Sequence, residues 1–170
     1  MSSPMTAQVF LAHQLVELSK IYDVTLVANL DGQQDMCSWL PKEVHTVDIA
    51  IQRTISPWSD FWCYFKLKQL CKKYKFALVH SVSPKAGFLS MFAARRAKVP
   101  VRIHTFTGQV WATKTGVKRA VLRMVDRFIA ACSTTILVDS KTQQSFLIEQ
   151  NIVSDSSSTV LCDGSISGVD

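Results

Sequence analysis

Residues 76–106 read FALVHSVSPKAGFLSMFAARRAKVPVRIHTF, and this stretch decides the fold class. Residues 76–80 form a short apolar run of the kind found in buried strands. A polar turn with a proline follows, and it leads into an apolar helix over residues 85–97. Residues 101–106 then predict a second strand. A strand, a helix and a strand in this order predict a parallel βαβ unit, because a parallel pair needs a crossover.

The same alternation continues on both sides of this unit. Upstream, the patterns predict a helix over residues 8–20, strands over 23–29 and 44–49, and a helix over 61–74 capped by Ser59 or Asp60. Downstream, they predict a helix over 115–131, a strand over 134–139, a helix over 141–150 and a strand over 159–162. Strands that alternate with helices predict an α/β fold, a Rossmann-like parallel sheet with helices on both faces.

The helix over residues 115–131 has the clearest period in the chain. Its apolar residues recur at positions 117, 120, 121, 124, 125, 128 and 129, a spacing that predicts a buried stripe. The other face carries Lys118, Arg119, Arg123 and Arg127, and Leu122 is its one apolar exception. This face is predicted to be basic and solvated.

Length and composition place the chain among globular proteins. Its 170 residues fit one domain, and 48% apolar with 19% charged residues exclude a disordered chain. No apolar run reaches the ~18–20 residues of a bilayer span, and the first ten residues show no secretory signal. Five cysteines without a CxxC pair argue against a disulfide framework or a zinc site. Buried thiols in the cytoplasm are therefore expected.

The basic charge is concentrated in the middle of the chain. Residues 61–130 carry 15 Lys and Arg side chains and one acid, Asp126, whereas the segments before and after are acidic overall. Such a block suits an anionic partner, and the alternative is a set of solvated helix faces. Nucleic acid is not expected, since the block shows neither interleaved surface aromatics nor a known reader motif. Asp126 is expected to form a surface ion pair with Arg123 or Arg127.

Ligands of parallel α/β sheets bind at the carboxyl ends of the strands, and two histidines lie there. His80 and His104 end successive predicted strands, so we expect them to be neighbours. Each is either a base or phosphate donor, or a structural histidine bonded to loop groups. Residues 84–87 either offer backbone N–H groups and Lys85 to an anion, or merely begin a helix that Ser83 caps. The chain has no GxGxxG, Walker, HExxH or GxSxG motif, so these patterns indicate no metal or nucleotide cofactor.

Several segments, taken in order, resemble a known family. They are residues 53–60 (RTISPWSD), 80–94 (HSVSPKAGFLSMFAA), 101–116 (VRIHTFTGQVWATKTG), 137–140 (LVDS) and 164–170 (GSISGVD). They are similar to the N-terminal domain of family-four retaining glycosyltransferases of the GT-B fold. The bacterial enzymes of capsule, exopolysaccharide and O-antigen synthesis are the most similar group.

The resemblance implies an acceptor-side domain over residues 1–163 and the start of an interdomain linker at 164–170. The family moves a sugar from a nucleotide-sugar donor with retention and without a required metal. In its polysaccharide enzymes the acceptor is often a polyprenyl-diphosphate-linked sugar at the inner face of the plasma membrane. The donor is a substrate held mainly by a C-terminal domain, so we expect no cofactor here and no transfer by this chain alone. The alternative is an inactive fragment that serves as an anion- or membrane-surface binding module.

The family fold begins with a strand, whereas this chain opens on a turn before its first helix, so we expect a piece of a longer protein without its first strand. Ser3 and Thr6 match the family's turn after that strand, which approaches donor phosphate and acceptor. The acceptor-binding residues expected at the carboxyl edge are His80, Lys85, Gly87, His104, Thr107, Gly108, Gln109, Trp111 and Lys114.

Two of these expectations concern the loop after residue 106. Thr107 stands where many relatives have a histidine thought to line the reaction centre, so no catalytic residue is assigned. Trp111 is expected to be exposed and to pack on a sugar or on the lipid-facing surface. The membrane or anion face is expected on Lys118, Arg119, Arg123 and Arg127.

Overall fold

The computed structural model describes residues 4–30, 38–52, 54, 56–161 and 164, and for residues 4–6 the backbone alone. The described helices are α1 (Pro4–Ser19), α2 (Pro57–Tyr74), α3 (Pro84–Arg96), α4 (Gly116–Cys132) and α5 (Lys141–Glu149). The described strands are β1 (Thr25–Ala28), β2 (His45–Asp48), β3 (Leu78–Ser81), β4 (Val101–Phe106), β5 (Thr135–Val138) and β6 (Ser158–Val160). Each predicted helix and strand is present, with ends shifted by a few residues.

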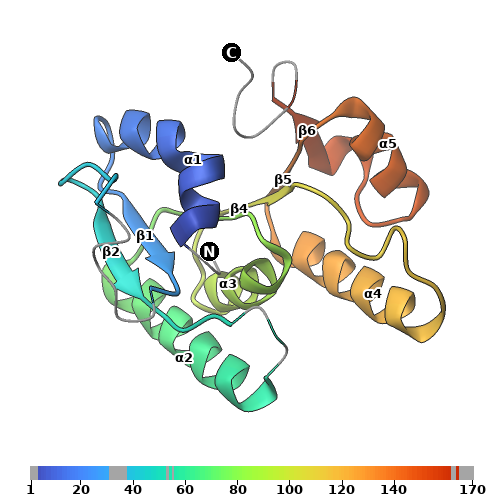
Figure 1. Ribbon diagram of the computed structural model, residues 1–170, viewed down its shortest axis with the longest axis horizontal. Coiled ribbons are helices and arrows are strands. Elements are labelled where there is room, and N and C mark those ends of the chain that lie inside the picture. Colours follow the sequence, from blue (N-terminus) through green and yellow to red (C-terminus); the bar gives the residue numbers. More distant parts are fainter. Residues whose placement is uncertain (1–3, 31–37, 53, 55, 162–163, 165–170) are drawn as a thin grey trace.

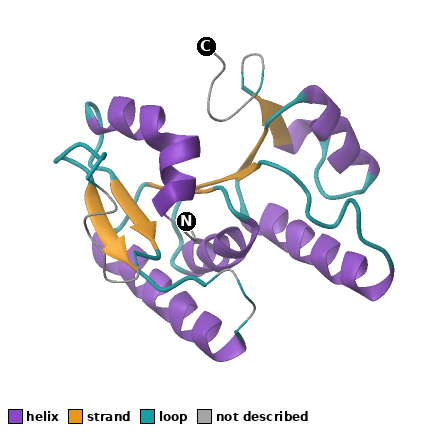
Figure 2. Ribbon diagram, viewed as in Figure 1, coloured by secondary structure: helices purple, strands orange, loops and turns teal. Residues whose placement is uncertain are grey.

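The strands form two parallel sheets. One pairs β1 with β2, and the other has the order β3-β4-β5-β6 (Figures 1 and 2). In the larger sheet Ser81 of β3 lies beside His104 of β4, which in turn lies beside Ile136 of β5. Every pair of neighbouring strands is parallel, so the predicted α/β class with crossover helices is confirmed.

Helices cover the larger sheet unequally. Helices α2, α3, α4 and α5 follow one another along one face, and α1 lies on the other side (Figure 1). On the first face Phe106 packs in one cluster with Leu122 of α4 and Leu147 of α5. On the other, Leu11 of α1 shares a cluster with Val82. Helices on both faces are therefore confirmed, and none of the described helices has the length and apolar composition of a bilayer span.

Two helix starts differ from the prediction in detail. The N-cap of α2 is Ser56, not Ser59 or Asp60, because Pro57 takes the first position of the helix. Ser83 is the N-cap of α3 and Pro84 follows it as expected, but the Ser83 side chain makes no capping bond. The Ser83 carbonyl instead accepts the first helical bond from the Gly87 N–H, at 2.7 Å.

Helix α4 is rotated about its axis from the predicted orientation. Val117 is 81% exposed, and Val121 and Met124 are exposed as well, although all three belong to the predicted buried stripe. Leu122, assigned to the solvated face, instead packs against the core cluster that contains Trp111. The stripe is correct only in its second half, where Ile129 is fully buried. The helical period was thus identified correctly, and the side of the helix that faces the core was not.

The described cysteines are Cys63, Cys71 and Cys132, and all three are buried free thiols. Burial raises the pKa of the Cys71 thiol, which keeps it protonated. These residues pack as small apolar side chains between helices, as the composition predicted.

Candidate functional site

The carboxyl ends of β3 and β4 place His80 and His104 on adjacent strands, as expected, but Ser81, not His80, pairs with His104 in the register. Because successive side chains of a strand alternate, the two imidazoles point to opposite faces of the sheet. His80 Nε2 lies 2.8 Å from Thr105 Oγ1, and His104 Nδ1 lies 2.7 Å from Ser81 Oγ. Each histidine is thus held by a hydroxyl from the neighbouring strand. Neither Ser81 nor Thr105 was singled out from the sequence, although the register of two parallel strands decides both contacts.

His104 is enclosed in the core. Its ring is fully buried and meets Phe106 edge to face at a centroid separation of 4.6 Å. Its Nε2 has no hydrogen-bond partner among the described residues. Burial, and next the proximity of His80, lower the pKa of His104 to about 3. A ring closed to solvent cannot reach a ligand as the described chain stands, so the burial of His104 favours the structural alternative.

Gly87 lies where it does because of that ring. A Cβ at Gly87 would stand 2.5 Å from Cε1 and 2.8 Å from Nδ1 of His104. The first turn of α3 can therefore pack against β4 only without a side chain at this position. Gly87 supports the edge from within and is itself buried.

His80 is half-buried, and it is the histidine of the pair that keeps some access to solvent. Burial lowers its pKa to about 4, so the imidazole is neutral at neutral pH. A neutral ring bonded to Thr105 can offer one nitrogen as a donor or acceptor to a ligand at the edge. His80 is therefore the candidate that this geometry favours.

Lys85 already has a partner of opposite charge. Its ammonium lies 2.6 Å from Asp60 Oδ1 and also donates to the Thr54 carbonyl. The second oxygen of Asp60 accepts from the Ser56 N–H at 3.2 Å. Asp60 thus ties the first turn of α2 to the first turn of α3, and Lys85 does not stand as the free cation that the sequence suggested.

Trp111 is buried, contrary to the prediction. Its side chain is 1% exposed, stacks on Phe146 of α5 at 5.4 Å and donates from Nε1 to Asp126 Oδ2 at 2.6 Å. The loop after β4 therefore folds its tryptophan beneath α4, and the ring is not available to a sugar or a lipid. Burial of this large ring stabilises the position of the loop, which the polar sequence of the loop does not indicate.

Asp126 is buried too, so the predicted surface ion pair is wrong. Desolvation raises its pKa to about 6, while the hydrogen bond from Trp111 opposes the shift. The sequence held one signal for this, because Asp126 lies three or four residues from both Leu122 and Ile129, which are core residues.

The arginines of α4 bind the end of α5 instead of pointing freely into solvent. Arg119 donates to the Gln150 side chain, Arg123 to the Gln150 carbonyl at 2.8 Å, and Arg127 to the Asn151 carbonyl at 2.9 Å. The guanidinium groups of Arg119 and Arg123 also lie within 6 Å of the Trp111 ring centre. Of the four residues of the predicted basic face, Lys118 and Arg127 are exposed.

Arg123→Ala is expected to lower the free energy of unfolding by about 1–2 kcal/mol, because it removes a charged donor from the Gln150 carbonyl and a cation from Trp111. Urea denaturation followed by circular dichroism measures this loss. Lys118→Ala, on the exposed side of the same helix, is the matched control and should change stability little. Equal stabilities of the two variants would contradict the structural role of Arg123.

The remaining predicted residues occupy the loop after β4. Gly108 has φ +153°, so the backbone does turn there in a region that favours glycine. Gln109 Oε1 accepts from Nε2 of Gln143 on α5 at 3.5 Å, and the buried Nε2 of Gln109 has no partner in the described chain. Thr107 is half-buried and Lys114 is exposed. Ser3 and the Thr6 side chain lie outside the described residues.

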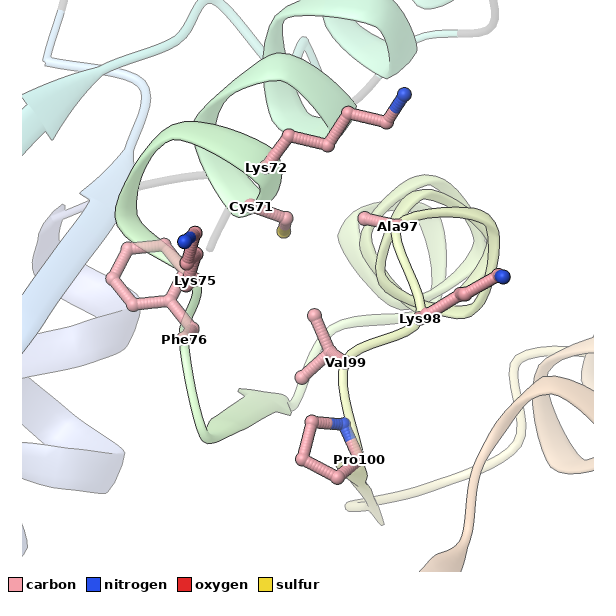
Figure 3. Close-up of a pocket in the computed structure, with 8 residues that line it drawn as sticks. All are labelled: Cys71, Lys72, Lys75, Phe76, Ala97, Lys98, Val99 and Pro100. Atoms are coloured by element: carbon pink, nitrogen blue, oxygen red, sulfur yellow. The ribbon is translucent and has the colours of Figure 1, made fainter.

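A hollow of about 310 Å³ lies at the opposite end of the sheet (Figure 3). It lies between the end of α2 and the segment that enters β4, and its lining includes Lys72, Lys75 and Lys98. Lys72 lies in the last turn of α2, and Lys75 and Lys98 lie just after α2 and α3, positions where cations offset the helix dipole. The hollow is remote from the carboxyl edge and is not part of the candidate site.

Residues 7–162 match the model of the glycosyl transferase 4-like domain. The chain belongs to this glycosyltransferase family. It is 32% identical over 121 residues to the capsular polysaccharide biosynthesis glycosyltransferase CapM of Staphylococcus aureus, a match that covers 71% of this chain and 32% of CapM.

A second relative in this glycosyltransferase family acts, by its name, on a lipid-linked sugar. It is the UDP-Gal:alpha-D-GlcNAc-diphosphoundecaprenol alpha-1,3-galactosyltransferase of Escherichia coli, 30% identical over 118 residues, which cover 68% of this chain and 30% of the relative. The chain thus spans about a third of the length of these two relatives. The family resemblance drawn from the sequence motifs is confirmed.

Proposed function

We propose that this chain is the acceptor-side domain of a glycosyltransferase of bacterial cell-surface polysaccharide synthesis. The reaction moves a sugar from a nucleotide-sugar donor to a polyprenyl-diphosphate-linked or polysaccharide acceptor, with retention and without a required metal. The family match over residues 7–162 carries this proposal. The printed names of the two relatives, one capsular and one acting on a diphosphoundecaprenol-linked sugar, support the kind of acceptor.

The carboxyl edge of β3 and β4 supplies the acceptor side of this proposed site. His80, neutral and held by Thr105, would accept or donate one hydrogen bond to an acceptor hydroxyl or phosphate oxygen. The ion pair of Asp60 with Lys85 would fix the starts of α2 and α3 at the same edge of the sheet. The whole enzyme would work at the cytoplasmic face of the membrane, where nucleotide-sugars and lipid-linked acceptors meet.

The test is transfer of radiolabelled sugar from nucleotide-sugar donors to membranes that carry lipid-linked acceptors. The 170-residue chain alone should transfer no label, and the same chain joined to a donor-binding domain of a relative should transfer it. His80→Ala should reduce transfer by about tenfold or more, since it removes the one edge histidine that a ligand can reach. His45→Ala, an exposed histidine on β2, is the matched control. Undiminished transfer by His80→Ala would exclude the assigned role of His80.

A further inference from the structure

Helix α2 presents a row of aromatic side chains to solvent. Its outer face carries Trp58, Phe61, Trp62 and Phe65, each between 42% and 75% exposed. We call these four residues the aromatic row. The opposite face of α2 buries Cys63, Leu67 and Cys71. A helix that already buries one face in the protein does not need large aromatic groups on the other, so the row indicates a partner.

The four rings form one continuous patch. Trp58 stacks on Phe61 with ring centres 6.4 Å apart and meets Trp62 edge to face at 6.2 Å. Phe61 lies 4.6 Å from Phe65. Because the residues follow one another at helical spacing, the patch runs along the first half of the helix.

The second half of the same helix carries lysines. Lys72 and Lys73 continue the outer face beyond the row, and Lys66 and Lys68 flank it. The only carboxylate of α2, Asp60, is paired with Lys85. Between residues 61 and 130 the only other acid is Asp126, which is buried. Helix α2 therefore presents cations and aromatic rings to solvent without an unpaired carboxylate of its own.

We propose that the outer face of α2 docks on an anionic phospholipid surface, with the aromatic row in the headgroup region and the lysines on the lipid phosphates. Tryptophan favours this interface because its ring is apolar and its N–H is polar. Lysines beside an inserted apolar face are the usual feature of helices that lie in the plane of a membrane. The row does correct one expectation, because the basic block has surface aromatics. The proposal also places the membrane face on α2, whereas the sequence pointed to the arginines of α4.

The position of the row matches the proposed acceptor. Asp60, between Trp58 and Phe61 on α2, contacts Lys85 at the carboxyl edge. A membrane under α2 would therefore bring a diphosphate-linked lipid to that edge. This step deepens the proposed function and rests on it, whereas the docking itself can be measured separately. Two copies joined through α2 would bring like charges together, which disfavours a second copy as the partner.

The experiment is co-sedimentation of the chain with vesicles of phosphatidylcholine alone or half phosphatidylglycerol. The chain should bind only the anionic vesicles, with a blue shift of tryptophan fluorescence. Trp58→Ser/Trp62→Ser should weaken binding at least about tenfold and abolish the shift. Ile21→Ser/Tyr22→Ser is the matched control, because Ile21 is 75% exposed, like Trp58, and lies at the end of α1.

The lysines are tested in the same assay. Lys72→Glu/Lys73→Glu should weaken binding by about fivefold or more for each lysine, and Lys141→Glu on α5 should have little effect. Val117→Ser/Met124→Ser removes the other exposed apolar row, on α4, and should also leave binding intact. All of the substituted side chains are exposed, and each is replaced by a smaller or charged group, so folding should be preserved.

Four results would overturn the proposal. The first is vesicle binding that the Trp58→Ser/Trp62→Ser variant retains, and the second is vesicle binding that only the α4 variant loses. The third is a dimer of the chain that the Trp58→Ser/Trp62→Ser variant dissociates. The fourth is a gel shift of single-stranded nucleic acid that this variant loses, while the unsubstituted chain does not bind vesicles. Transfer to a short-chain acceptor in detergent separates the two proposals. If the joined protein transfers sugar but the chain does not bind vesicles, the proposed function stands and membrane docking is excluded. If the chain binds vesicles but the protein joined to its donor domain transfers no sugar, docking stands and the proposed function is excluded.

Discussion

Gly87→Ala is expected to lower the free energy of unfolding by about 1–3 kcal/mol, the usual cost of overpacking a filled core. The added methyl group would stand 2.5 Å from a ring carbon of His104. That ring is fully buried and cannot turn away, because Ser81 holds Nδ1 and Phe106 packs against the ring edge to face. Helix α3 must therefore move off β4, and urea denaturation measures the loss.

A double-mutant cycle separates this clash from the intrinsic effect of alanine in a helix. Alanine alone favours a helix over glycine by about 1 kcal/mol, so without the ring the substitution should be neutral or stabilising. In the His104→Ala background, Gly87→Ala should cost nothing, and the coupling between the two sites should exceed about 1 kcal/mol. Additive effects in the cycle would show that the ring does not dictate the glycine.

The order of helices and strands was predictable because apolar periodicity is a local property. In the unit over residues 76–106, the strand, turn and helix lie where the apolar pattern predicted them. The parallel pairing of its two strands was predictable because a helix connects them. The family motifs likewise lie in contiguous segments and needed no tertiary information.

The candidate site was less predictable because it depends on which side of each element faces inward. Residue types alone predicted that Trp111 is an exposed ligand-binding residue and that Asp126 forms a surface ion pair. In the structure both side chains are buried and are hydrogen-bonded to each other. The rotation of α4 that exposes Val117 and buries Asp126 follows from packing against the loop after β4. The exposed row on α2 was hidden in the same way, since a run such as FWCYF has no period to separate its outer from its inner rings.

Asp126 should make the protein less stable as the pH rises. Its pKa is raised from 3.8 to about 6, so the folded chain holds the proton more tightly than the unfolded chain. The stability it contributes is complete below about pH 4 and is lost as the pH passes about 6, a change of about 3 kcal/mol. The histidines act in the opposite direction. The lowered pKa values of His80 and His104 mean that stability falls as the pH drops from about 6.5 toward 4.

The variant Asp126→Asn isolates this carboxylate. The amide oxygen of asparagine can still accept a hydrogen bond from the Trp111 N–H, and the side chain carries no charge. Both histidines remain, so their contributions to the pH dependence of stability cancel when the variant is compared with the wild type. The difference in unfolding free energy between wild type and variant should shift by about 3 kcal/mol between about pH 4 and pH 7.5, in favour of the variant at the higher pH. Thermal or urea denaturation at several pH values measures it.

Asp126→Ala is the matched control, because it removes the acceptor together with the charge. The Trp111 N–H is then buried without a partner, so this variant should be less stable than Asp126→Asn by about 1–3 kcal/mol at every pH. A difference between wild type and Asp126→Asn that does not change with pH would mean that the carboxylate is solvated. The loop after β4 would then not be anchored beneath α4 by a buried Trp111–Asp126 pair.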